Sequence, residues 1–311
     1  MSVLSSEAVV LRTWPLRDAD LIVSFFTRDY GRMRGVAKAA LRSRKRFGGA
    51  LEPMTLARAW FAERERQELV RLDQLEIVSS PLSAPVDQAR MAVLSFYAEV
   101  LDEALPERDP QDAVFRLLVS VLEQTAAVED SPRSQSRDRG HPAANTEIGA
   151  PLVPTLGPGK PAQPQMNQPE VSHPQANQLK ANHPQPAQAQ ANQPWMALTY
   201  FSLWTTRLMG LLPDISRCIV CNEVLQAAEV SFSSVADGLF CALHRNGSAS
   251  ALSADSWQLA QRMLRAPASA FAAEPWTRKR GQDLRRFTLQ TLERHLERKL
   301  KSAEAIARLG G

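Results

Sequence analysis

Residues 7–37 read EAVVLRTWPLRDADLIVSFFTRDYGRMRGVA, and this stretch decides the fold. It holds three short runs rich in Val, Ile, Leu and Phe, at 7–13, 20–27 and 31–37, separated by turn-forming residues such as Pro15 and Asp29. Runs of this length and composition between turn formers predict β-strands. Two further runs, MTLARAWFA at 54–62 and ELVRLDQLEIV at 68–78, extend the pattern to five strands.

Five short strands within about seventy residues fit a small closed barrel. We therefore predict an OB-fold over residues 1–80, since this is the commonest five-stranded barrel that binds nucleic acid. An SH3-like barrel is an alternative on strand count alone.

Beyond residue 80 the apolar residues recur at helical spacing, which predicts an α-helical domain over 81–130 and 195–311. Within it we expect a helix that begins at Asp109-Pro110, and helices at 253–265 and 280–301. Asp102 and Glu103 have the pattern of an ordinary helix surface. The predicted fold class is α+β and multidomain, with the barrel first.

Residues 131–194 interrupt this helical pattern. The segment holds twelve of the 21 prolines and no Phe, Trp, Tyr or Cys, and it repeats loosely as HPQANQ, KANHPQ and AQANQP. Such a composition cannot bury enough apolar surface to offset chain entropy, so we predict a disordered insertion within the helical domain.

The charge of the chain is unevenly placed. The net charge is +4, yet residues 28–49 hold eight Lys or Arg and a single acid, Asp29, and residues 278–308 hold ten basic and four acidic residues. Focused positive charge indicates an anionic partner, most often nucleic acid. No signal peptide and no apolar run of membrane-spanning length is visible, so we expect a cytoplasmic protein without a membrane contact.

All three cysteines fall in one motif, C-x2-C followed after nineteen residues by C-x2-H. Two such knuckles bring four ligands to one tetrahedral ion, and three thiolates with an imidazole suit zinc. The predicted ligands are Cys218, Cys221, Cys241 and His244, within a zinc-ribbon-like element at 216–246. With four protein ligands no position is left for water, so one zinc ion with a structural role is expected.

No catalytic arrangement is present in the sequence: it lacks a glycine-rich phosphate loop, an HExxH motif and a GxSxG motif. We therefore expect a protein that is not an enzyme.

The stretch from Glu7 to Phe61 resembles the RecO family of bacterial DNA repair proteins. The matching positions lie at 8–11, 20–27, 31, 35–38, 43–47 and 51–53, and LMGLLPDISRCIVC, GLFCALH and HLERKLKS are similar to later family segments. The chain departs from the family at Ala39, where glycine is common, and at His244, where a fourth cysteine is common.

The resemblance implies a recombination mediator without catalytic turnover. It implies binding of single- and double-stranded DNA, annealing of complementary strands, contact with the C-terminal tail of single-stranded DNA-binding protein (SSB) and, with RecR, loading of RecA onto SSB-coated DNA. A nucleoid-associated cytoplasmic protein follows from this. An RNA- or ribosome-associated zinc protein built on the same barrel is the alternative.

Basic side chains of the first charged run are the predicted DNA contacts, because flexible cations neutralise phosphates without reading sequence. They are Arg32, Arg34, Lys38, Arg42, Arg44, Lys45 and Arg46. The SSB tail is acidic and ends in apolar residues. We expect it to bind in an apolar groove of the helical domain that has basic residues at its rim. The stripe of Leu289, Leu292, Leu296 and Leu300 is a candidate wall, although core packing is the favoured reading of that stripe.

Overall fold

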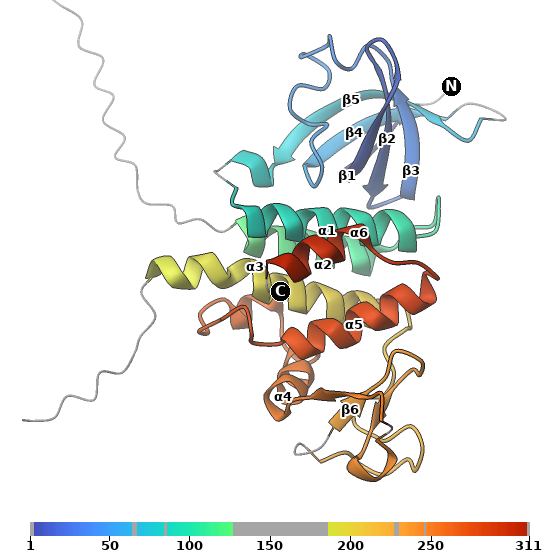
Figure 1. Cartoon of the computed structure of the whole chain (residues 1–311). Coiled ribbons are helices and arrows are strands. Elements are labelled where there is room, and N and C mark those ends of the chain that lie inside the picture. The colour runs from blue at the N-terminus through green and yellow to red at the C-terminus, as the bar shows by residue number, and fades with distance from the viewer. Residues whose placement is uncertain are drawn as a thin grey trace, which may run out of the picture. The chain divides into compact units, whose positions relative to one another are not determined.

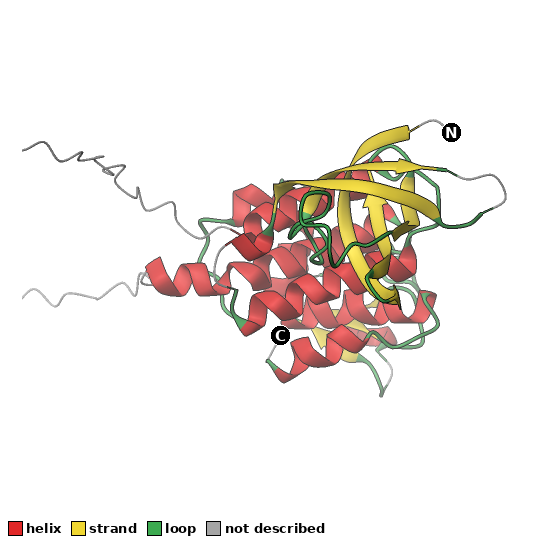
Figure 2. Ribbon diagram, turned by 90° about the horizontal axis from the view of Figure 1, so that it is seen from above, coloured by secondary structure: helices red, strands yellow, loops and turns green. Residues whose placement is uncertain are grey.

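The N-terminal strands close into a barrel. The computed structural model describes residues 3–63, 67–83, 86–126, 186–226, 230–245 and 247–309, without the side chains of Ser83, Ala126 and 186–193. The barrel strands are β1 (Val3–Arg17), β2 (Asp20–Thr27), β3 (Gly31–Ala37), β4 (Leu56–Ala62) and β5 (Val70–Ser79). They pair in the order β1-β2-β3-β5-β4, β1 pairs with β4, and β3 runs parallel to β5 (Figure 1, Figure 2). The predicted OB-like barrel is confirmed.

Strand β1 is buried on both of its faces, which explains the unbroken apolar run AVVL. Ala8 and Val10 point into the barrel core, whereas Val9 and Leu11 belong to the core of the helices. Successive side chains of a strand point to opposite faces. A strand between two cores therefore shows no polar alternation.

The helical part follows the barrel. Its long helices are α1 (Gln88–Ala104), α2 (Asp112–Ala126), α3 (Pro186–Leu208), α4 (Ala254–Met263), α5 (Gln282–His295) and α6 (Lys301–Arg308), and η1 (Pro81–Ser83), η2 (Ala242–His244) and η3 (Ala268–Phe271) are short 3₁₀ turns. None of the helices in the described residues is long and apolar enough to cross a membrane. Helix α3 begins inside the 131–194 segment, and the rest of that segment lies outside the described residues.

The prediction of one helix over 280–301 is wrong, while that of a helix near 253–265 is confirmed by α4. Helix α5 ends at His295, and Glu297 then adopts a left-handed φ of +52°. A second helix, α6, starts at Lys301. The apolar spacing continues across the break because Leu296 and Leu300 both pack against the helical core, so periodicity alone does not reveal it.

The carboxylate of Glu99 on α1 caps the start of α6. It accepts from the backbone N–H groups of Lys301 (3.0 Å) and Ser302 (2.7 Å) and from the Ser302 hydroxyl (2.5 Å). Burial raises the pKa of Glu99, but these hydrogen bonds outweigh burial and hold its pKa below the usual value. An acid at a helix N-terminus satisfies otherwise unpaired N–H groups, so α6 is fixed to α1.

Asp102 and Glu103 join the barrel to the helices, so the expectation of an ordinary helix surface is wrong. Asp102 is buried and accepts a 2.6 Å hydrogen bond from the Ser24 hydroxyl on β2. Arg12 on β1 reaches Asp102 Oδ2 at 3.5 Å, and Glu103 pairs with Arg298 at 2.6 Å. The barrel and the helices form one compact unit through these contacts and the apolar ones beside them.

The loop before α2 packs on the β2–β3 turn. Helix α2 begins at Asp112, so the predicted start at Asp109-Pro110 is wrong. Asp109 lies instead against Gly31, which has a left-handed φ of +74°. A Cβ atom on Gly31 would overlap the backbone of Asp109, so only glycine fits this close approach.

Candidate nucleic-acid interface and metal centre

The basic run forms the long connection between β3 and β4. Its start is fixed to the β1–β2 turn, because Ala39 N–H donates to Asp20 Oδ1 (2.7 Å) and Leu41 N–H to the Ala19 carbonyl (3.1 Å). Its end is fixed by Phe47, whose ring is buried in the barrel core. The connection is thus held at both ends and presents the residues between them.

Lys38, Arg42, Arg44 and Lys45 are the exposed cations of this connection. None of the four makes an ion pair with a residue that the structure describes. Arg34, on β3, is also exposed, with its Nε 3.5 Å from Glu107 Oε1. Unpaired cations gathered on a fixed loop are suited to a polyanion.

Arg32 does not belong to this group, and its assignment as a DNA contact needs correction. Its side chain is buried, its Nε donates to the Leu105 carbonyl (2.9 Å), and its Nη1 lies 3.2 Å from Glu107 Oε1. The side chain bridges the barrel and the end of α1. A phosphate could reach it only if these contacts broke.

Arg46 also has a structural role in the connection. It donates from Nη2 to the Lys38 carbonyl (2.6 Å) and from Nε to Ser43 Oγ (3.0 Å), and its guanidinium lies over the Phe47 ring. These contacts fold the two ends of the basic stretch together. Its neighbours Arg44 and Lys45 remain exposed.

Ala39 occupies a position that favours glycine, as its departure from the family pattern suggested. Its φ is +52°. A non-glycine residue in the left-handed region is strained by about 1–2 kcal/mol. Glycine removes this strain, but it also loses more conformational entropy on folding than alanine does, which offsets part of the gain in stability. We expect Ala39→Gly to raise the free energy of unfolding by about 1 kcal/mol in urea denaturation.

The neighbouring variant Ala40→Gly provides the control, because Ala40 is buried and has no left-handed φ. It should lower the free energy of unfolding. A stabilisation by both glycine variants would contradict the strain at Ala39.

The metal element contains a small sheet, β6 (Val230–Phe232), β7 (Leu239–Phe240) and β8 (Ser250–Leu252), in the order β7-β6-β8. Cys218 and Cys221 lie on the loop that precedes it, and Cys241 and His244 follow β7. One ligand atom from each of the four residues lies within 4.8 Å of the others. His244 Nδ1 is 3.2 Å from Cys241 Sγ and 3.8 Å from Cys218 Sγ. The four predicted ligands therefore meet and could hold one metal ion.

Backbone geometry prepares the first knuckle for a thiolate. Asn222, at φ +60°, turns the chain so that its N–H donates to the Cys218 carbonyl (2.9 Å). Burial opposes ionisation of Cys218, but backbone N–H groups of Cys221, Cys241 and Val220 stabilise the thiolate and lower its pKa to about 6. The donor set and its surroundings fit a metal that takes sulfur and nitrogen ligands.

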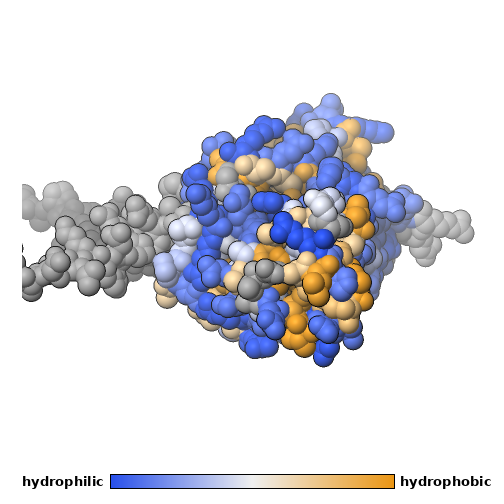
Figure 3. Space-filling model, turned by 60° about the horizontal axis from the view of Figure 1, so that its bottom comes forward, coloured by the Kyte–Doolittle hydropathy of each residue, from blue (hydrophilic) through white to orange (hydrophobic). Residues whose placement is uncertain are grey.

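The two knuckles are brought together by main-chain contacts. Ile219 N–H donates to the Leu239 carbonyl (3.0 Å), which places the first knuckle beside β7. The apolar side chains of the knuckles stay exposed, among them Ile219, Val220 and Leu243. In Figure 3 the bottom of Figure 1, where β6 is labelled, is turned toward the viewer. This face shows apolar patches within a polar surface. Since the knuckles bury little apolar surface of their own, a bound metal would be their main cross-link.

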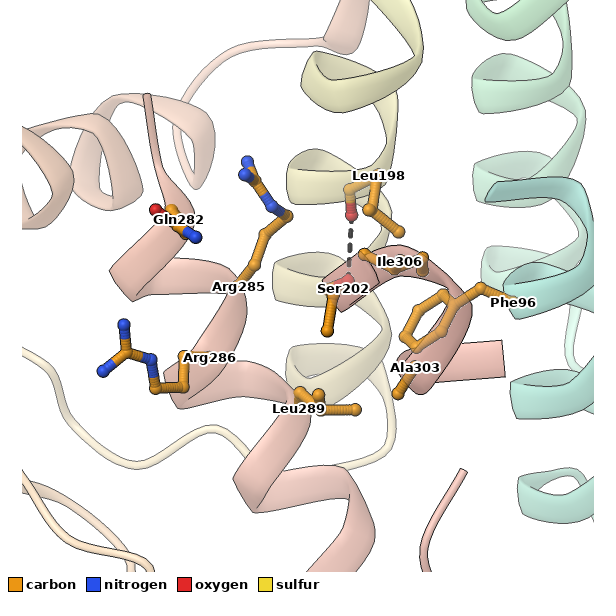
Figure 4. Close-up of a pocket in the computed structure, with 10 residues that line it drawn as sticks. Phe96, Leu198, Ser202, Gln282, Arg285, Arg286, Leu289, Ala303 and Ile306 are labelled. Atoms are coloured by element: carbon orange, nitrogen blue, oxygen red, sulfur yellow. Dashed lines mark hydrogen bonds between the residues drawn. The ribbon is translucent and has the colours of Figure 1, made fainter. Parts of the chain in front are cut away.

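A pocket of about 240 Å³ lies among α1, α3, α5 and α6 (Figure 4). Its wall is largely apolar, with Phe96, Leu198, Leu289 and Ile306 among the lining residues. Of the predicted leucine stripe, Leu289 reaches this pocket, while Leu292 and Leu300 are buried in the core. Residues from four distant segments line it, so no local pattern in the sequence could have identified it.

Two arginines of α5 border this pocket. Arg286 is exposed, whereas Arg285 is buried and lies over the Trp195 ring. Arg285 donates to Thr199 Oγ1 (2.9 Å) and to two backbone carbonyls, and it makes no ion pair with a carboxylate of the described residues. Burial lowers the pKa of Arg285 to about 10, so it stays charged at neutral pH. The charge of Arg285 is thus stabilised by protein oxygens, and the exposed Arg286 is the cation at the border of the pocket that solvent can reach.

Comparison with known proteins agrees with this architecture. The family model "Recombination protein O N terminal" matches residues 1–81, and "Recombination protein O C terminal" matches residues 86–135 and 187–304. The chain is 41% identical, over 98% of both chains, to the DNA repair protein RecO of Koribacter versatilis. It is 26% identical to the DNA repair protein RecO of Anaeromyxobacter sp. strain K, over 97% of this chain and 95% of that protein.

Proposed function

The chain belongs to the RecO family of DNA repair proteins, and from this premise we propose that it is a recombination mediator that acts on DNA without catalytic turnover. It binds single- and double-stranded DNA, anneals complementary strands and, with RecR, helps to load RecA onto SSB-coated DNA. The observation that carries the proposal is the group of exposed, unpaired cations on a fixed connection of an OB-like barrel.

The proposed DNA contacts are reduced from seven residues to five. The five are Arg34, Lys38, Arg42, Arg44 and Lys45. Arg32 and Arg46 are left out because their guanidinium groups make hydrogen bonds within the protein. Long flexible cations bind phosphates of any sequence. They also screen the repulsion between two strands, which annealing requires.

The triple variant Arg42→Gln/Arg44→Gln/Lys45→Gln tests the interface. We expect weaker binding to every DNA sequence, and a salt dependence whose slope falls by about 0.7 per lost contact on single strands and about 0.9 on duplex. Fluorescence anisotropy with labelled oligonucleotides at several salt concentrations measures both quantities.

Arg58→Gln is the control for this variant, since Arg58 is an exposed cation on β4 that lies outside the connection. It should leave the slope unchanged. Equal slopes for the wild type and the triple variant would remove the connection from the DNA interface.

Strand annealing separates a DNA mediator from the RNA-associated alternative. We expect the protein to accelerate pairing of SSB-coated complementary DNA strands, and to prefer single-stranded DNA over RNA in competition. A clear preference for RNA without annealing would support the alternative.

We assign the metal as one structural zinc ion, held by Cys218, Cys221, Cys241 and His244. Zinc forms closed tetrahedral sites with thiolates and imidazole, and the four donors leave no position for a reacting water. X-ray absorption that detects three sulfur neighbours and one nitrogen, without oxygen, would support a structural site.

The pocket on the helices is the proposed dock for the SSB tail. Its apolar wall suits the apolar end of the tail, and the exposed Arg286 at its border suits the carboxylates. A labelled acidic peptide that ends in an apolar residue should bind, and Leu289→Asp should weaken binding at least tenfold, as expected for a pocket anchor.

Arg265→Ala is the control for the tail peptide, because Arg265 on the neighbouring segment does not line this pocket. Undiminished binding by Leu289→Asp would place the tail elsewhere.

We further propose a barrel domain at 1–80, a helical domain at 81–130 and 195–311, and action in the cytoplasm at the nucleoid.

A further inference from the structure

A row of four side chains crosses the outer surface of the barrel. In the strand register Trp14 of β1 lies opposite Ile22 of β2, Ile22 opposite Val36 of β3, and Val36 opposite Arg71 of β5. Residues directly opposite in neighbouring strands share one face of a sheet. Their sequence neighbours Leu21, Val23, Ala37 and Leu72 fill the barrel core, so the row faces outward.

Only part of this outer face is covered by the helices. The adjacent row, formed by Arg12, Ser24 and Arg34, contacts Asp102 of α1 and Glu107 of the following loop. The row that begins with Trp14 is displaced from this adjacent row by two residues on each strand, in the direction of the β1–β2 turn. Trp14, Ile22 and Val36 are half-buried there and keep part of their apolar surface in solvent.

Cations surround this apolar row. Arg12 lies over the Trp14 indole with its guanidinium carbon 5.7 Å from the ring centroid. Arg17, the last residue of β1, and Lys38, which directly follows β3, are exposed. Beside Val36 lies a hollow of about 480 Å³, lined also by Lys38, residues 67–70 and Arg71. One acid, Glu68, lines it as well.

The row is continuous with the basic connection. Lys38 directly follows β3 and begins that connection, and Leu41 N–H donates to the carbonyl of Ala19 in the β1–β2 turn. Lys38 and Val36 line the same hollow, so a strand whose phosphates lie on Lys38 would have its bases next to the Val36 end of the row. The side chains there are those that bind a base: an indole for stacking, aliphatic neighbours, and flanking cations.

We propose that Trp14 is a base-stacking residue, and that the row of Trp14, Ile22 and Val36 receives unpaired bases of single-stranded nucleic acid. This inference rests on the proposed function, because the basic connection supplies the backbone contacts. Bases in a duplex are already paired and stacked, so they cannot use the indole. The row thus adds affinity for single strands alone and helps a mediator to prefer unpaired DNA.

The test compares Trp14→Ala, Trp14→Phe and Trp60→Ala in the full-length protein. Trp60 is a matched control, since it is also outward-facing and half-buried on the barrel but lies opposite Ser5 and Gln74 in another row. We expect Trp14→Ala to bind an oligo-dT strand about tenfold more weakly while its duplex affinity is unchanged. Trp14→Phe should retain most of the affinity, and Trp60→Ala all of it.

Photo-crosslinking gives a second readout that does not depend on the stability of a variant. A single strand that carries 5-iodouracil should crosslink to the wild-type protein within the peptide that contains Trp14. An equal loss for single strand and duplex in Trp14→Ala, or crosslinks elsewhere only, would overturn the inference. Wild-type protein that binds no DNA at all would instead overturn the proposed function.

Discussion

Replacing Gly31 by alanine will lower the free energy of unfolding by about 2–5 kcal/mol, the sum of backbone strain and overpacking. Gly31 has a left-handed φ of +74°, and its missing Cβ leaves the space in which the backbone of Asp109 lies. A methyl group must push this loop away from the barrel. The loop carries Glu107 and Arg108, whose contacts with Arg32 would be lost as well.

Gly210→Ala is the matched control for Gly31→Ala. Gly210 has nearly the same φ, +71°, but a Cβ there would meet no heavy atom within 4 Å. We expect only the backbone term of about 1–2 kcal/mol. Urea denaturation of both variants measures the difference, and equal losses would contradict the close packing of Gly31 on the loop.

If the proposed zinc ion is bound, replacing Cys218 by serine will abolish its stoichiometric binding and unfold the metal element locally. In small zinc domains the bound metal contributes about 10–16 kcal/mol of folding free energy, so the loss of one thiolate outweighs any single packing contact. Elemental analysis should fall from one zinc per chain toward none. Limited proteolysis should then cleave within residues 216–246, and a chelator should have the same effect on the wild type.

Two variants serve as controls for Cys218→Ser. Leu243→Ser changes a side chain that is 89% exposed within the second knuckle, and it should retain the metal. His244→Cys restores the family's four-cysteine pattern and should also bind one zinc. Full zinc occupancy in Cys218→Ser would contradict the assigned ligand set.

Local patterns in the sequence predicted most of the barrel. All five strands were predictable because each is a short apolar run between turn formers, and these signals act within a few residues. The cluster of four candidate metal ligands was predictable for a similar reason, since the C-x2-C and C-x2-H spacings suit two knuckles. Neither pattern depends on knowing which distant segments meet.

Contacts between distant segments were not predictable in the same way. Asp102 resembles a solvated helix residue until Ser24 and Arg12 approach it from the barrel. Arg32 resembles its basic neighbours in sequence, yet its position on β3 turns it toward Leu105 and Glu107. The pocket on the helices joins residues that are more than two hundred positions apart.

The sequence by itself determined the family, the strands of the barrel and the four candidate metal ligands, because these depend on local composition and spacing. The tertiary structure decided which cations of the basic run are exposed and unpaired, where the helices form a pocket, and that Trp14 shares an outer row with Ile22 and Val36. The physical reason is that burial and pairing belong to the packed chain: within the same basic run one guanidinium is solvated, while another is buried and bonded to the protein.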